Sequence, residues 1–550
     1  MPPDLSWDNI PYELLLNIYR ELSYRDLVSC GAVSIHWRHV MRDKTLWKQH
    51  LKGVYAWWNW EPLVTTTYYD EFMFFKRNIP KFLKEVVNDY DYDLRHCIFS
   101  PCGAFFLVCG KGAYFCVYRS DPIEFLHERC LKDSLSWQEI TTAEFSPDES
   151  KVMLTGVRQD GSGELAVFSI ETSGEVHFIC RSPCSPPGVA CWFDNDYLIC
   201  GEIYNFRFNS AIASSISQLW LMSVPKDRKG ALTGVLCPLL RFLNREGKLR
   251  FPLISNYVSS RFRRVLQLTQ EADMENKTLE QKLAELELCV STADDLSELR
   301  RVLDAQQQCF DCYLKHNIGV ERSESAANCI CFCHEMLSKM LIFVDGDNSN
   351  RVCFKIIDHN LFSEALAMQR FAKIEQEGEE DDGWNFVLHR VDTPDHYIEV
   401  DGVITNIALS VDKKQLFVSY ETRAFASSTK YSVYCVDLEK MILDRFPFSG
   451  ALLSNEQGFL CSNEFLLASA VGEEVHIWAR LHGGSEVQRL AVDTRIVDLS
   501  LHPTNNTLIT ASQNYLAPKL AADGVVQHFF VLQSVSALIV IGSCLNNIEA

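Results

Sequence analysis

The side chains best suited to bind a metal ion gather in one stretch of the sequence. They are Cys309, Cys312, Cys329, Cys331, Cys333 and His334. The first two have the Cys-x-x-Cys spacing of a zinc ligand pair. The other three cysteines alternate, as residues on one face of a β-strand do, and supply no second pair of that spacing. We therefore expect these cysteines to pack as small apolar residues, and we predict no metal site.

Other residues that could do chemistry are isolated. His396 follows Asp395 and His476 lies shortly after Glu474, and we expect surface or hydrogen-bonded core histidines at both positions. The Gly-Lys-Gly turn at 110–112 is shorter than a glycine-rich loop that cradles a phosphate. The sequence contains no nucleophile elbow, zinc-protease, Walker or kinase motif. We predict no catalytic residues in this chain and no cofactor.

The composition is that of a folded protein with an acidic surface. The chain has 550 residues, of which 47% are hydrophobic and 23% charged. Its formal net charge of -20 argues against a nucleic-acid partner, because such proteins carry a basic footprint. The first residues lack the basic and apolar regions of a secretory signal, so the 21 cysteines are expected to be reduced thiols. We expect a cytoplasmic or nuclear protein.

The N-terminus predicts short amphipathic helices. Asn9 and Pro11 predict the start of a helix whose apolar residues recur at intervals of three and four. These residues are Leu14, Leu15, Ile18, Tyr19 and Leu22. Ser23 with Asp26 predicts the cap of a second helix, and further short helices follow. So small a unit cannot bury this much apolar surface alone, so a partner protein or the following domain must cover part of it.

The rest of the chain predicts repeated β-structure. Residues 53–92 are rich in aromatic residues and predict a rigid helical spacer. In residues 93–224 a unit of short apolar runs and polar turns begins at 99, 145 and 191, a period of about 46, and it returns in 336–516. Such units bury both faces when they stack around an axis. We predict a β-propeller of about seven or eight blades, interrupted by an irregular insertion at 225–335 and followed by an atypical apolar tail at 517–550.

Three segments leave alternatives open. Residues 278–314 have helical composition and predict either a partner-binding helix or a solvent-exposed loop helix. The acidic run at 375–382 is expected to be a solvated loop. The apolar stretch from Gly524 approaches the length of a membrane span, but polar residues interrupt it and no basic flank follows. We expect closing strands of the propeller rather than a membrane anchor, and no membrane partner.

Residues 5–51 resemble the F-box. The resemblance is carried, in the family's order and spacing, by Ile10-Pro11, Glu13-Leu14-Leu15, Asp26-Leu27, Trp37-Arg38 and Leu46-Trp47. In that family the module binds a Skp-type adaptor and so joins a cullin–RING ubiquitin ligase. The adaptor-binding residues that the resemblance implies are Ile10, Pro11, Leu14, Leu15, Ile18, Leu22, Leu27, Val33 and Trp37. The alternative is a helical cap packed on the chain's own next domain.

An F-box at 1–52, a spacer and degenerate WD-like repeats together resemble the F-box/WD-repeat proteins. The resemblance implies a mainly β protein with a small α domain, whose propeller recruits a protein substrate for ubiquitination by other subunits. The chain itself would then not be an enzyme. Related receptors also bind the damage-binding adaptor of a second cullin, which is a further expected context. The rival hypothesis is a propeller scaffold for trafficking or cytoskeletal assembly, whose F-box controls its own turnover.

Overall fold

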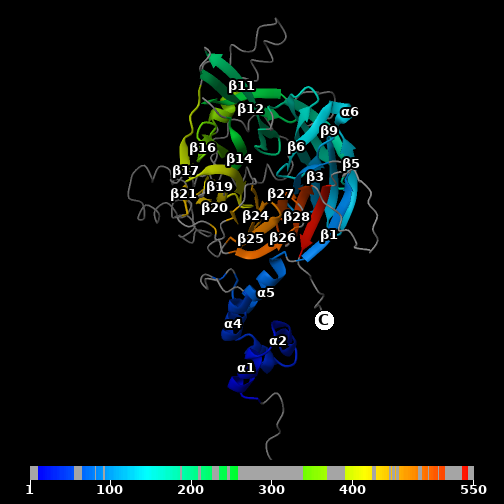
Figure 1. Cartoon of the computed structure of the whole chain (residues 1–550), viewed down its shortest axis with the longest axis vertical. Helices are drawn as coiled ribbons and strands as arrows, with labels where there is room; N and C mark the ends of the chain where they lie inside the picture. Colours follow the sequence, from blue (N-terminus) through cyan, green and yellow to red (C-terminus); the bar gives the residue numbers. More distant parts are fainter. Residues whose placement is uncertain are drawn as a thin grey trace, which may run out of the picture.

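Helices and strands occupy separate parts of the molecule. The structure, a computed structural model of the 550-residue chain, places a small helical module beside a ring of β-sheets (Figure 1). Among the described residues, every helix is too short or too polar to cross a bilayer. The described residues are 10–54, 63, 65–80, 82–90, 93–185, 189–208, 212–225, 235–244, 248–257, 338–358, 360–367, 391–423, 429–444, 448, 452–453, 458–480, 486–492, 495–505, 507–513 and 536–542.

Four short helices form the N-terminal module. They are α1 (Tyr12–Arg20), α2 (Tyr24–Cys30), α3 (Ile35–Met41) and α4 (Lys44–Val54). The side chains of Ser23 and Ser34 cap α2 and α3, because each accepts a hydrogen bond from the backbone N–H three residues later. Pro11, rather than Asn9, is the cap residue of α1, and it makes no side-chain cap bond. Asn9 lies outside the described residues.

A fifth helix, α5 (Tyr68–Asn78), joins the module to the ring. The side chain of Thr67 caps it, and Phe72 and Phe75 are buried. The prediction of a helical spacer over 53–92 is wrong beyond this helix, because residues 82–90 form strand β1. The strand that pairs with β1 lies near the end of the chain, so no local pattern could show it.

The ring begins with three antiparallel sheets of four strands, each in chain order. Blade 1 consists of β2 (Leu94–Phe99), β3 (Phe105–Gly110), β4 (Tyr114–Ser120) and β5 (Ile123–Cys130). The short helix α6 (Lys132–Leu135) leads into blade 2, which consists of β6 (Trp137–Phe145), β7 (Lys151–Arg158), β8 (Gly163–Ile170) and β9 (Val176–Pro183). Blade 3 consists of β10 (Ala190–Trp192), β11 (Tyr197–Phe208), β12 (Ile212–Ser223) and β13 (Val235–Asn244).

Three more sheets follow in the same antiparallel pattern. Blade 4 consists of β14 (Arg250–Asn256), β15 (Lys339–Val344), β16 (Arg351–Ile357) and β17 (His396–Glu399). Blade 5 consists of β18 (Val403–Leu409), β19 (Gln415–Arg423), β20 (Thr429–Asp437) and β21 (Ile442–Leu443), and β22 (Leu452–Leu453) also pairs with β20. Blade 6 consists of β23 (Phe459–Ser462), β24 (Leu466–Val471), β25 (Glu474–Ala479) and β26 (Glu486–Ala491).

Blade 4 corrects the predicted insertion. Strands β13 and β14 both fall within 225–335, so part of that segment belongs to the propeller. The first two strands of blade 4 are so far apart in sequence that the repeat period could not reveal them. The cysteines and histidine of 309–334, the helical segment 278–314 and the acidic run 375–382 lie outside the described residues.

The last sheet closes the ring with strands from both ends of the chain. Its order is β1-β29-β28-β27, formed by β1 (Phe82–Tyr90), β29 (Ser536–Gly542), β28 (Leu508–Gln513) and β27 (Arg495–Leu501). Strand β29 pairs antiparallel with both β28 and β1, which confirms for these residues that the apolar tail supplies a closing strand. The described residues thus form seven sheets, and the predicted mainly β propeller with a small helical domain is confirmed.

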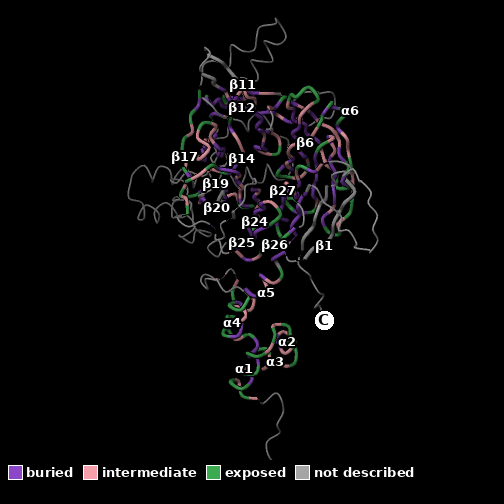
Figure 2. The backbone as a smooth tube through the Cα atoms, viewed as in Figure 1, coloured by how far each residue is buried: buried purple, intermediate pink, exposed green. Residues whose placement is uncertain are grey.

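Apolar side chains fill the spaces between neighbouring blades. Between blade 1 and the closing blade, for example, Phe99 and Phe106 pack with Ile509 and Ala511. Figure 2 shows buried residues along the strands of the ring and many exposed residues on the helical module. The cysteines within the described residues are free and most are buried, as expected of thiols that pack as small apolar side chains.

Candidate functional site

The first helix of the module leaves an apolar stripe in solvent. The stripe consists of Pro11, Leu14 and Ile18, which lie three and four residues apart and therefore on one face of α1. Leu14 is 58% exposed and Ile18 is 49% exposed. Leu15 and Tyr19, on the neighbouring face of the helix, are each 1% exposed. Helix α1 is therefore apolar on two faces, and its own module covers one of them.

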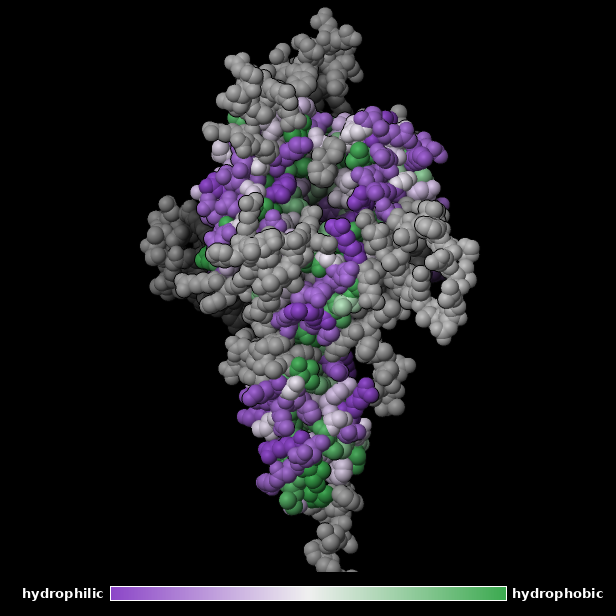
Figure 3. Space-filling view, in the orientation of Figure 1, coloured by the Kyte–Doolittle hydropathy of each residue, from purple (hydrophilic) through white to green (hydrophobic). Residues whose placement is uncertain are grey.

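Two more exposed apolar residues lie between the end of α2 and the first residue of α3. Val33 is 61% exposed and Ile35, the first residue of α3, is 86% exposed. A ring nitrogen of His36 lies 3.0 Å from the carbonyl oxygen of Ile10, which fixes the start of α3 against the residue before α1's cap. We call Pro11, Leu14, Ile18, Val33 and Ile35 the apolar face. Figure 3 shows hydrophobic residues gathered at the end of the module far from the ring.

The nine residues predicted to bind an adaptor do not all lie on the apolar face. Pro11, Leu14, Ile18 and Val33 are exposed. Ile10, Leu22 and Trp37 are partly buried and pack against the core of the module. Leu15 and Leu27 are buried within that core, so they support the surface from behind rather than form part of it. Sequence reasoning missed Ile35. The available signal was an isoleucine directly after Ser34, the cap residue of α3.

Hydrogen bonds and ring contacts hold the helices behind this face. The hydroxyl of Tyr12 donates to the carboxylate of Asp43 over 2.5 Å, and this bond, with burial, raises the pKa of Tyr12 to about 12. The guanidinium of Arg38 donates to the carbonyl oxygen of Gly31 over 3.0 Å. The rings of Tyr19 and Trp37 meet edge to face with centroids 6.2 Å apart. The apolar face is thus presented by helices fixed to one another.

Helix α5 fixes the module to the ring. The indole of Trp47 packs on Tyr69 and Phe72 of α5, with ring centroids 4.9 and 5.2 Å apart. On its other side, Phe74 packs edge to face on Phe465, with centroids 4.7 Å apart. Phe465 directly precedes β24 of blade 6. One apolar cluster therefore runs from the module through α5 into the ring. That the spacer is rigid stays a prediction.

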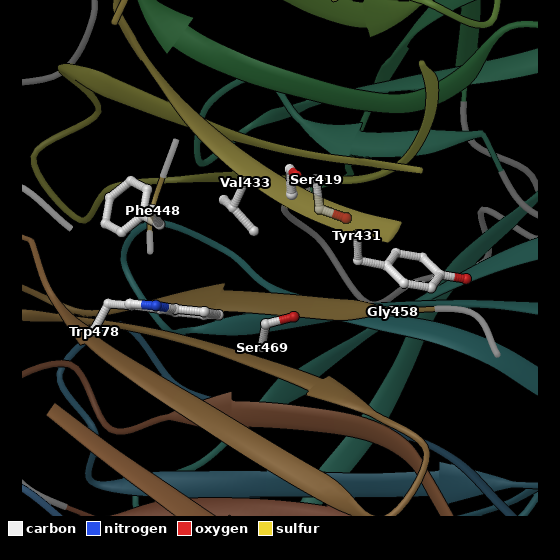
Figure 4. Close-up of a pocket in the computed structure, with 8 residues that line it drawn as sticks. Ser419, Tyr431, Val433, Phe448, Gly458, Ser469 and Trp478 are labelled. Atoms are coloured by element: carbon white, nitrogen blue, oxygen red, sulfur yellow. The ribbon is translucent and has the colours of Figure 1, made fainter. Parts of the chain in front are cut away.

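The ring contains a small buried cavity between blades 5 and 6. It has a volume of about 10 Å³, which is room for about one water molecule. Figure 4 shows serine side chains of β19 and β24 and the ring of Trp478 facing this space. Phe448 and Trp478 close one end, with centroids 6.1 Å apart. This cavity is too small to hold a substrate.

A larger, open cleft lies at the Gly-Lys-Gly turn between β3 and β4. Its volume is about 560 Å³, and its lining is Lys111, Gly112, Lys132, Trp137, Gln138, Glu139 and Gln159. The ammonium group of Lys111 is already paired with Asp93 at 2.8 Å, and Glu139 lies 3.7 Å from Arg95. The turn joins two strands rather than opening a helix, so it lacks the geometry of a phosphate loop, as expected.

The isolated histidines lie as expected. His396 is exposed on β17. His476 is fully buried, with its ring nitrogens 2.8 Å from Glu486 and 3.3 Å from Glu474. Among the described residues, one group of side chains is close enough to share a metal ion. It consists of Glu171 and Glu175 in the β8–β9 turn and His177 of β9. Two of the three are exposed, and His177 already pairs with Glu171 at 3.1 Å.

Comparison with known proteins agrees with this architecture at the N-terminus. Residues 7–52 match the family model described as F-box-like. The module is an F-box-like domain. Its match covers α1 to α3 and most of α4, and therefore includes every residue of the apolar face. The predicted resemblance of this segment is confirmed.

Relatives of similar architecture match most of the chain. F-box/WD repeat-containing protein 5 of Mus musculus is 24% identical over 436 residues, which are 74% of this chain and 72% of that protein. The protein of the same name from Homo sapiens is 23% identical over 442 residues, 74% of this chain and 73% of that protein. The predicted resemblance to F-box/WD-repeat proteins is confirmed.

A solved propeller also resembles the chain. The beta-propeller domain of Myceliophteria thermophila Cps50 (Swd1) is 10% identical with a TM-score of 0.39, covering 85% of this chain and 99% of that domain. The propeller architecture follows from the strand order of the seven described sheets.

Proposed function

We propose that this protein is the substrate-recognition subunit of a cullin–RING ubiquitin ligase. An F-box-like domain joined to a propeller is, in general, the architecture of a substrate adaptor rather than of an enzyme. In this proposal the apolar face binds a Skp-type adaptor, and the propeller binds the protein to be ubiquitinated. The observation that carries the proposal is that an F-box-like domain with a well-packed core leaves its apolar face in water.

The energetics favour a protein partner on this face. Covering an exposed Leu or Ile side chain contributes about 1.5–3 kcal/mol. Leu14, Ile18, Val33 and Ile35 all retain more than a third of their exposure while similar residues of the same helices are buried. The four side chains are also held by a rigid module, so little conformational freedom is lost when a partner covers them. The partner that fits the apolar face is an adaptor with a flat or grooved apolar surface.

The propeller is the proposed substrate receptor because it offers many loops on a rigid frame. Since the described residues hold no convergent set of catalytic side chains, catalysis in this proposal comes from proximity. Holding a substrate lysine near a ubiquitin-carrying enzyme on another subunit raises its local concentration. The continuous apolar cluster through α5 would keep the two binding sites at a constant separation.

The test is adaptor capture by variants of the apolar face. Leu14→Asp and Ile18→Asp each place a charge in the contact, where it would lose its hydration. The amount of Skp-type adaptor that co-purifies with the full-length double variant is expected to fall at least about tenfold. Val54→Asp is the matched control, because Val54 is 51% exposed but lies at the end of α4. Unchanged adaptor capture by the Leu14/Ile18 variant would overturn the proposal.

A second measurement separates this function from the scaffold hypothesis. With the proteasome inhibited, partners captured by the wild-type propeller are expected to carry ubiquitin, and partners captured by the Leu14/Ile18 variant are not. If only this chain becomes ubiquitinated while its partners do not, the F-box controls the chain's own turnover and the scaffold reading is correct.

A further inference from the structure

The seam between blade 1 and the closing blade joins residues 401 positions apart in the sequence. Two backbone N–H groups of β2 donate across it. The N–H of Cys97 donates to Asp498 over 2.9 Å, and the N–H of Phe99 donates to the hydroxyl of Ser500 over 3.2 Å. The chain passes from β1 of the closing blade directly to β2 of blade 1. The strands that face each other at the seam, β27 and β2, are far apart in the sequence, and side-chain contacts join them.

His96 bridges three strands at this seam. Its Nδ1 lies 2.6 Å from the carboxylate of Asp498 on β27, and its Nε2 lies 3.0 Å from the carbonyl oxygen of Ala143 on β6. A carbonyl oxygen and an ionised carboxylate can only accept hydrogen bonds, and the same Asp498 oxygen also accepts one from Cys97. Beside an ionised Asp498, both ring nitrogens of His96 donate. Only the imidazolium form has a proton on each nitrogen.

The surroundings of His96 favour its charge. Burial lowers the pKa of His96, but the carboxylate of Asp498 and the accepted hydrogen bonds outweigh burial, and the net direction is raised. Glu144 of β6 acts in the same direction when its carboxyl group is ionised. On β6 the other carboxylate, Glu139, pairs with Arg95, and the thiols of Cys97 and Cys109 on β2 and β3 are buried with raised pKa values and hence neutral.

A second histidine crosses the same seam with the opposite requirement. His502, in the β27–β28 turn, accepts hydrogen bonds at Nδ1 from the backbone N–H groups of Thr504 and Asn505, over 3.2 and 3.1 Å. Its Nε2 lies 3.0 Å from the carbonyl oxygen of Gly103, to which it donates. This pattern needs a neutral ring, because protonating Nδ1 would break both accepted bonds. Gly103 permits the approach, since a Cβ there would lie 2.2 Å from the His502 ring.

We propose that the seam is a two-histidine clasp, complete only in a window of pH where His96 is charged and His502 is neutral. Alkaline conditions remove a donor from His96 and leave either Asp498 or the Ala143 carbonyl without its partner. Acid conditions break the bonds that Nδ1 of His502 accepts. The closure of the propeller is therefore coupled to protonation from both sides, and a fall or rise in pH loosens the ring at one defined place.

The stabilisation by His96 and the stabilisation by His502 change in opposite directions with pH. The ion pair of His96 contributes fully below the ordinary histidine pKa of about 6.5, and this contribution is lost as the pH rises through the raised pKa of the folded state. Removing His96 should therefore matter most in acid. Removing His502 should matter most at neutral and alkaline pH, where its hydrogen bonds are intact.

The experiment measures unfolding of the full-length chain between pH 5.5 and 9 for wild type, His96→Gln and His502→Gln. Gln can neither carry charge nor donate at both ends. At pH 5.5 we expect His96→Gln to raise the equilibrium constant for unfolding about tenfold, with the difference shrinking toward pH 9. We expect His502→Gln to show the opposite trend. His396→Gln, at an exposed position, is the control and should show no trend.

Parallel trends for the two variants, or a pH-independent effect of His96→Gln, would overturn the proposal. If either variant fails to fold, Asp498→Asn should remove the same pH trend as His96→Gln. Hydrogen exchange of the wild-type chain, corrected for its intrinsic pH dependence, provides a separate readout. Peptides containing Cys97 and Phe99 are expected to lose protection first on both sides of the window, and uniform loss over all blades would contradict the clasp.

Discussion

Neighbouring residues of one type can have opposite roles in this protein. Leu14 and Leu15 are adjacent in α1, yet Leu14 is exposed and Leu15 is buried. Helical spacing alone places both in one broad apolar stripe. The packing of α3 and α4 decides which side of the stripe is covered. The same principle applies to charge. Glu139 and Glu144 are both partly exposed on β6, but Glu139 pairs with Arg95 while Glu144 accepts a hydrogen bond from the backbone N–H of Trp192.

Glu144 gives a residue-scale prediction about pH. Burial raises its pKa to about 7, although the N–H of Trp192, Lys413 and His96 oppose this. Between pH 4.5 and about 7, Glu144 therefore keeps its proton in the folded state and loses it in the unfolded chain. The free energy of unfolding falls as the pH rises through this range. Glu144→Gln, which cannot ionise, should raise the free energy of unfolding at pH 8 by up to about 3 kcal/mol.

The measurement is the melting temperature of the full chain at pH 5 and pH 8. At pH 5 the variant and the wild type should melt together, because Glu144 is then protonated. Glu139→Gln, on the same strand but paired with Arg95, is the matched control and should not stabilise the chain at pH 8. A gain of equal size at both pH values would contradict the burial of an ionised carboxylate as the cause.

Among the helices and strands, α5 contacts both the helical module and the ring. Its N-terminal half packs on Trp47 of the module, and Phe74 packs on the ring. The buried carboxylate of Glu71 accepts hydrogen bonds from the backbone N–H and the hydroxyl of Thr65, over 2.8 and 2.9 Å, which fixes the entry to the helix. A single helix thus sets the orientation of the apolar face relative to the propeller.

Phe465→Ala tests this role. Removing the ring that Phe74 contacts should loosen the module on the propeller without altering the apolar face. Small-angle scattering should show a broader distance distribution, while capture of a Skp-type adaptor stays at the wild-type level. Under the proposed function, substrate ubiquitination should fall several-fold even though both partners still bind, because a loose joint lowers the effective concentration. Phe125→Ala, at an exposed phenylalanine of β5, is the control.

At the scale of the whole molecule, both ends of the chain build one sheet. Strand β1 carries the polypeptide from the F-box-like domain into the closing blade, and β29 lies between β1 and β28. A sheet with a missing inner strand exposes unpaired backbone groups on both of its neighbours. The F-box-like domain is therefore attached to β1, and the place of β1 in the sheet depends on its pairing with β29 near the end of the chain.

Truncation tests this closure. A chain that ends at residue 530 lacks β29 and should melt several degrees lower than the full chain, with protease cleavage beginning in β1 and β28. A chain that ends at residue 542 keeps β29 and should behave like the full chain. Equal melting temperatures for the two truncations would show that β29 does not hold the closing blade together.

Features of this protein that depend on local pattern could be predicted from its amino-acid sequence. The helices of the module, the three evenly spaced blades at the start of the ring and the F-box-like motif all follow from residue types at short, regular intervals. The separate positions of Leu14 and Ile35 in solvent and of Leu15 and Leu27 in the core did not follow, because burial depends on which helices meet.

The closure of the ring became visible only in the folded molecule. Blade 4 combines strands from either side of a long intervening segment, the closing blade combines both ends of the chain, and His96 meets Asp498 across 402 positions, from 96 to 498. Pairing between distant strands leaves no periodic trace in the sequence, since each strand is compatible with many partners until the fold brings one beside it. The charge on His96 is decided at the same level, because it depends on acceptors that local sequence does not contain.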